Sequence, residues 1–154
     1  MTKNEIIKFI SEDKLELVNP LIEEIFNYYH EINVSFEDIF FSKFTRDVDF
    51  KNQPLAIGKI IISNSCNTET ALIHELLHLH IPLEHDVYTL WFPGLYEDLK
   101  LLSDDIQNVI EHDLMLNRFL SFGYDISLFL KSATLNIDYK KDKKSDNNMV
   151  YLDV

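Results

Sequence analysis

Two histidines and a glutamate form the pattern H-E-x-x-H at residues 74–78, which read HELLH. Helical spacing places both imidazole rings on one face of a helix, where they can reach a single metal ion. Glu75 is turned about 100° around the axis, within reach of a water bound to that ion. Zinc-dependent hydrolysis needs neutral nitrogen ligands, an open coordination position and a carboxylate that accepts a proton. The pattern therefore predicts a helix with His74 and His78 as zinc ligands and Glu75 as general base.

The residues around this motif indicate a largely apolar helix. It is expected to begin with Thr68 as its N-cap and to run to Ile81, where Pro82 would stop it. Its side chains are apolar except along the arc that contains the two motif histidines. His80 points away from that arc, so we expect it to have a structural role.

The segments before the motif predict helices followed by strands. Residues 4–32 have helical spacing, in two pieces if Asn19-Pro20 starts a second helix. The phenylalanine-rich residues 35–50 are expected to form a strand, or a short helix and then a strand. Residues 54–63 are rich in β-branched side chains and lie between proline and a polar turn, which is typical of a strand. An edge strand beside the motif helix would offer unpaired backbone groups to an extended peptide.

The segments after the motif predict a long helix and a C-terminal hairpin. The helix is expected to cover residues 96–122, with a break near Ser103-Asp104 as an alternative, and Gly123 is well suited to end it. The remaining expected segments are an irregular stretch at 83–95, a short apolar piece at 125–130, and hairpin strands at 134–139 and 149–154 around a charged loop at 140–148.

A third ligand has to come from outside the motif, because catalytic zinc usually has three protein ligands and one water. Glu84 and His85 follow the motif closely along the chain, and residues 108–113 form a second candidate region. In that region, His112 and Glu111 are the two candidates for the third ligand.

A helical wheel of the long helix favours His112 over Glu111. Asp113 falls within the apolar arc, where a carboxylate needs a partner, and ligand imidazoles usually have a carboxylate partner. His112 lies at the flank of the arc, so we expect it to be the third ligand with Asp113 as its orienting group. Glu111 falls nearly opposite, at a solvated position, and stays as the alternative ligand. The arc is defined by Ile106, Val109, Ile110, Leu116 and Leu120.

Length and charge limit the kind of protein that this chain can be. Its 154 residues fit one domain with a real core. The net charge of −12 argues against nucleic acid or an anionic membrane as a partner. With Cys66 as the single cysteine, no internal disulfide is possible. The charged N-terminal segment and the lack of a long apolar run predict a soluble, cytoplasmic protein.

The chain resembles the zincin superfamily of metallopeptidases. The resemblance rests on the motif at residues 74–78, the strand before it and the helix with Glu111 and His112 after it. It implies a single α+β, zincin-like domain over residues 1–154, with an N-terminal helix, a small twisted sheet with an edge strand, the motif helix, a further helix and the C-terminal hairpin. In two respects the chain departs from known subfamilies. Glu84 stands where one subfamily has a third histidine after a glycine turn. Met115 stands four residues after Glu111, where another subfamily has aspartate.

The resemblance implies hydrolysis of a peptide or protein substrate, with Glu75 as base and later as proton donor. An oxyanion donor is often a phenol or a cation, and Tyr88, Tyr96 and Tyr124 are candidates. The alternative is a zincin-like fold that binds a partner, or a plain structural domain, without catalysis. The sequence leaves the subfamily and the oligomeric state open.

Overall fold

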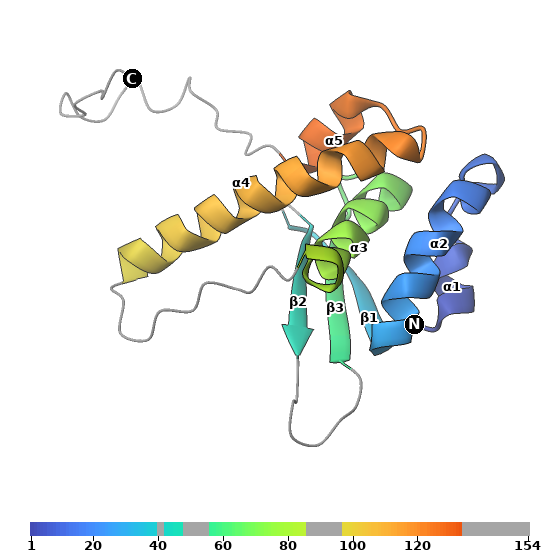
Figure 1. Ribbon diagram of the computed structural model, residues 1–154, viewed down its shortest axis with the longest axis horizontal. Helices are drawn as coiled ribbons and strands as arrows, with labels where there is room; N and C mark the ends of the chain where they lie inside the picture. Colours follow the sequence, from blue (N-terminus) through green and yellow to red (C-terminus); the bar gives the residue numbers. More distant parts are fainter. Residues whose placement is uncertain (40–41, 48–55, 86–96, 134–154) are drawn as a thin grey trace.

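A computed structural model describes residues 1–39, 42–47, 56–85 and 97–133. Within these residues the protein has five helices and one three-stranded mixed sheet (Figure 1), which confirms the predicted α+β class. The expected hairpin at 134–154 lies outside the described residues, as does most of the irregular stretch at 83–95. The elements in order are α1 (Lys3–Ile7), α2 (Glu12–Tyr28), β1 (Tyr29–Glu37), β2 (Lys43–Asp47), β3 (Ala56–Ser63), α3 (Thr68–His85), α4 (Glu97–Ser121) and α5 (Ile126–Ala133).

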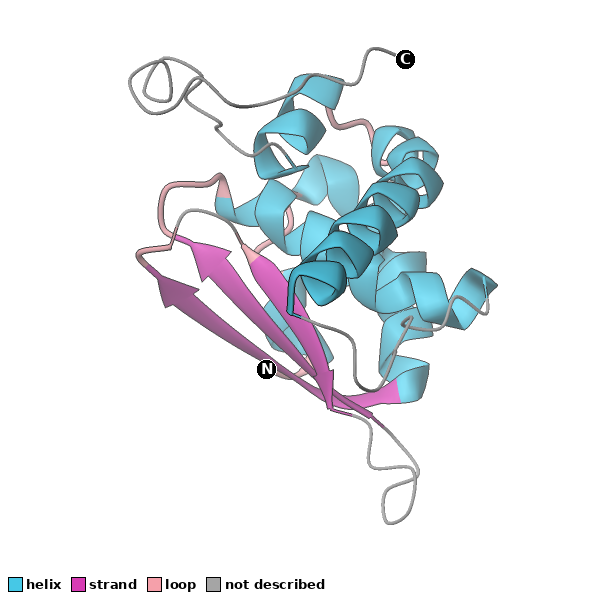
Figure 2. Cartoon of the chain, turned by 90° about the vertical axis from the view of Figure 1, so that its left-hand side faces the viewer, coloured by secondary structure: helices cyan, strands magenta, loops and turns pink. Residues whose placement is uncertain are grey.

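The sheet has the strand order β1–β3–β2. β3 is the central strand, parallel to β1 and antiparallel to β2. The strand predicted at residues 54–63 is therefore confirmed, but it is the central strand, and β1 and β2 form the two edges. Residues 35–50 contain the end of β1 and all of β2, so two strands occur there and no helix is found in the described part. Figure 2 shows the helices on one side of the sheet.

Helix α3 is the centre of the core, because every residue from 70 to 81 is buried. It packs against β3, where Gly58 allows a close approach: a Cβ atom added at Gly58 would lie 3.0 Å from Leu79 Cδ1. Ile60 and Ile62 of β3 are fully buried in the same cluster. The H-E-x-x-H motif therefore lies in the fully buried middle of this helix.

Both prolines that were expected to bound helices lie inside them. Pro20 is within α2 and Pro82 is within α3. Each proline removes one helical hydrogen bond, but apolar packing on both sides outweighs that loss. For example, Leu83 packs against the core beyond Pro82. The expected continuation of the first helix to residue 32 is also wrong, because β1 begins at Tyr29.

The ends of α3 and α4 show how local sequence sets the helix limits. Asn67 is the N-cap of α3, since its Oδ1 accepts a hydrogen bond from the Thr70 backbone N–H at 3.0 Å. Thr68 is thus the first helical residue and not the cap. Gly123 follows α4 with a φ of 79°, a conformation that favours glycine, and so ends the helix as predicted. In the described residues no helix has the length and apolar character that crossing a bilayer requires.

Candidate metal centre

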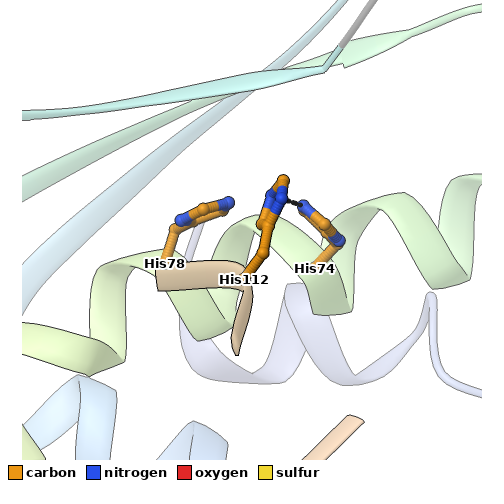
Figure 3. A group of neighbouring side chains, drawn as sticks. All are labelled: His74, His78 and His112. Atoms are coloured by element: carbon orange, nitrogen blue, oxygen red, sulfur yellow. Dashed lines mark hydrogen bonds between the residues drawn. The ribbon is translucent and has the colours of Figure 1, made fainter. Parts of the chain in front are cut away.

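Three histidine rings converge where helices α3 and α4 pack together. His74 and His78 come from α3 and His112 comes from α4. Their possible ligand atoms all lie within 4.8 Å of one another, and Figure 3 shows the three rings grouped together. The structure therefore brings together the three residues that were predicted as zinc ligands.

The spacing of the rings fits one ion. His74 Nε2 lies 3.2 Å from His112 Nε2. Two nitrogens at about 2.0–2.1 Å from a tetrahedral zinc would be about 3.3 Å apart. Without an ion, one of these nitrogens would have to carry a hydrogen and donate it to the other. Three imidazoles are also a donor set found in catalytic zinc sites, so these residues fit zinc.

Glu111 orients the His78 ring in this arrangement. Its Oε2 lies 2.6 Å from Nδ1 of His78, and its Oε1 accepts a hydrogen bond from Gln107 Nε2 at 2.7 Å. A carboxylate can only accept, so His78 donates from Nδ1 and keeps its lone pair on Nε2. Glu111 is 2% exposed, so its expected solvated position is wrong. The carboxylate that contacts one of the three histidines is Glu111, whereas Asp113 is exposed.

The helical wheel chose the wrong face of α4. The residues that it placed in the core are mostly exposed, up to 68% for Val109. The buried face instead carries Glu111, Met115 and Phe119. A carboxylate can be buried there because His78 and Gln107 satisfy its hydrogen bonds. The pattern of apolar residues along α4 does not reveal such partners. The exposed residues of the predicted face are Ile106, Val109, Ile110 and Leu120.

Two phenylalanines enclose the histidines. Phe44 of β2 stacks on His78, with ring centroids 4.7 Å apart and planes at 16°. Phe129 of α5 packs against His74 at 5.0 Å and against His112 at 5.5 Å. Neither residue was predicted to lie at the site, because phenylalanine is common in cores and neither is near the motif in sequence.

Burial sets the protonation states of the site. It lowers the pKa of His74 to about 2, with smaller effects of His78 and His112, and lowers the pKa of His112 to about 4. Both rings are therefore neutral at pH 7 and able to bind metal. Burial, together with the charge of Glu111, raises the pKa of Glu75 to about 8. Positive charge at the three histidines would lower that pKa and favour the ionised form that a general base needs.

These shifts predict how the stability of the metal-free protein depends on pH. His74 and His112 contribute stability that is present above their ordinary pKa of 6.5 and is lost as the pH falls towards their folded values. Glu75 contributes stability that is present below 4.5 and is lost as the pH rises to about 8. Thermal unfolding after chelation should therefore give the highest Tm near pH 6.5.

Glu75→Gln is the matched variant for this measurement. It should remove the decline in Tm between pH 6.5 and 8, while the decline below pH 6.5 remains. A wild-type Tm that rises steadily to pH 8 would contradict the assignment of a raised pKa to Glu75.

His80 has the structural role that was predicted for it. It is buried, and its Nε2 lies 2.7 Å from Glu24 Oε2. Arg118 of α4 pairs with the same Glu24 oxygen at 2.7 Å and with Glu84 at 3.2 Å. This cluster joins α2, α3 and α4. Glu84, considered above as a ligand, is exposed and belongs to this cluster, and the His85 side chain lies outside what the structure describes.

Tyr124 is engaged outside the histidine cluster. Its hydroxyl group donates to Glu69 Oε1 at 2.7 Å, and Glu69 also accepts from the backbone N–H and the hydroxyl of Ser11. These bonds tie the start of α3 to the start of α2. The other two tyrosines considered as oxyanion donors, Tyr88 and Tyr96, lie outside the described residues.

No protein-family model matches the chain, and no match was found among the curated proteins or the solved structures.

Proposed function

We propose that the chain is a zincin-like, zinc-dependent peptidase whose metal is held by His74, His78 and His112. The observation that carries the proposal is the convergence of His112, from a separate helix, on the two histidines of the motif. A chance H-E-x-x-H pattern has no reason to meet a third imidazole at ligand distance. The buried carboxylate Glu75, next to His74 on the same helix, supplies the remaining group that metal-assisted hydrolysis needs.

Each residue has a defined role in the proposed reaction. A bound zinc ion supplies Lewis acidity, polarising the scissile carbonyl group and lowering the pKa of a bound water towards roughly 7. Glu75 accepts the proton of the attacking water and passes it to the leaving amine. His78 is held in its ligand tautomer by Glu111. The phenylalanine rings beside the histidines reduce the access of bulk water to the site.

The position of β2 supports a peptide as the substrate. β2 is at one edge of the sheet, and within the described residues its outer side has no partner strand. Phe44 of β2 contacts the ligand His78, so this edge passes directly beside the histidines. An extended peptide could add to such an edge through backbone hydrogen bonds, with its scissile bond close to Glu75.

The direct test is to measure metal content and proteolysis on the same sample. We expect about one zinc per chain, and cleavage of an unfolded protein substrate that stops on chelation and returns when zinc is added. Mass spectrometry of the products would show peptide-bond hydrolysis. A protein that binds zinc and cleaves no peptide would favour the non-catalytic alternative, whereas a protein that binds no zinc would contradict the metal centre.

A further inference from the structure

Gln107 is linked to the candidate metal centre through two hydrogen bonds in series. Its side-chain amide donates to Glu111 Oε1 at 2.7 Å, and Glu111 Oε2 accepts from Nδ1 of His78 at 2.6 Å. Gln107 and Glu111 are one turn apart on α4, so the first bond holds within a single helix. The second bond crosses to α3. The amide thus contacts the oxygen atom of Glu111 that faces away from the histidine.

We propose that Gln107 is a positioning residue for the ligand His78 and acts through Glu111. The inference rests on the proposed function, because it assigns a role at the same metal site. With both oxygens engaged, the Glu111 carboxylate cannot rotate away from His78 without losing a hydrogen bond. His78 is then kept in the tautomer with its lone pair on Nε2, the form that binds a metal.

Glutamine suits this role because of its chemistry. Its amide donates a hydrogen bond at any pH and adds no charge beside the buried Glu111. A lysine would place a cation there and compete with His78 for the carboxylate. A leucine of similar size would leave Glu111 Oε1 without this donor, and a buried polar atom without a partner is costly.

The inference can be tested by a double-mutant cycle on zinc affinity. Gln107→Leu alone should weaken zinc binding about 10-fold, at the lower end of the 10–100-fold typical of losing an outer partner of a ligand. In a Glu111→Ala background the same change should have little effect, because the group through which Gln107 acts is gone. Asn117→Leu, an exposed position on α4, is the matched control and should leave affinity unchanged. The affinities come from competition with a chromophoric chelator.

A second readout does not require metal. Nitrogen chemical shifts of the His78 ring in the metal-free protein should show the tautomer with hydrogen on Nδ1, and Gln107→Leu should shift it towards a mixture of tautomers. Equal losses of affinity from Gln107→Leu in both backgrounds, or an unchanged tautomer, would overturn the positioning role. If the wild type binds no zinc, the proposed function fails. The nitrogen chemical shifts of the His78 ring then decide by themselves whether Gln107 positions His78.

Discussion

Glu75→Gln is expected to keep zinc bound and to lower peptide hydrolysis by several orders of magnitude. Glutamine has nearly the same shape but cannot accept the proton of the attacking water. Glu75 is only 3% exposed, so bulk water cannot easily take over its role. Measuring kcat/KM and zinc content on the same preparations would separate loss of the base from loss of the metal.

The matched control for this change is Glu16→Gln, on the exposed side of α2. It makes the same chemical change far from the motif in sequence and should leave kcat/KM and zinc content unaltered. Full hydrolysis by Glu75→Gln would contradict the assignment of Glu75 as the base. A variant that also loses zinc would indicate that the carboxylate supports the metal site instead.

His112→Ala is expected to lower zinc affinity more than any other single change on α4. It removes one of the three proposed ligands, whereas Glu111→Ala removes an outer partner of a proposed ligand and should lower zinc affinity about 10–100-fold. Asp113→Ala should have almost no effect, because Asp113 is exposed. Competition titrations of the three variants would rank these neighbouring residues directly.

A different ranking would change the site assignment. If Glu111→Ala abolished binding and His112→Ala did not, Glu111 would be the third ligand and would have to leave His78 to reach the metal. Circular dichroism of each metal-free variant is needed as a control for folding, since Glu111→Ala leaves a buried imidazole donor without its partner.

The local sequence pattern was sufficient to predict the motif helix and the strand before it. Residues 54–63 and the helix with His74 and His78 were predictable because β-branched residues and helical spacing act over a few residues. The prolines were misinterpreted for the opposite reason. Whether Pro20 or Pro82 ends a helix depends on what the following turn packs against, and that contact comes from distant parts of the chain.

His112 does lie beside the two motif histidines, but the reason for choosing it was partly wrong. His112 was favoured because Asp113 was thought to be its buried partner, but the buried carboxylate is Glu111 and it contacts His78. Hydrophobic content defines a face of an isolated helix. Contacts with side chains of α3, such as His78, decide which face of α4 is buried. The spacing of apolar residues within α4 does not predict those contacts.

The burial of α3 has a kinetic consequence for the site. A helix with no exposed residue between positions 70 and 81 can open only when the core opens, so we expect the backbone amides of His74 and His78 to exchange slowly. The first half of α4 has several exposed apolar side chains and can fray at a lower free-energy cost. His112 lies just beyond this segment, so an opening of α4 that extended to His112 would release an ion while the other two histidines stay in place. The rate of metal exchange would then be a property of α4.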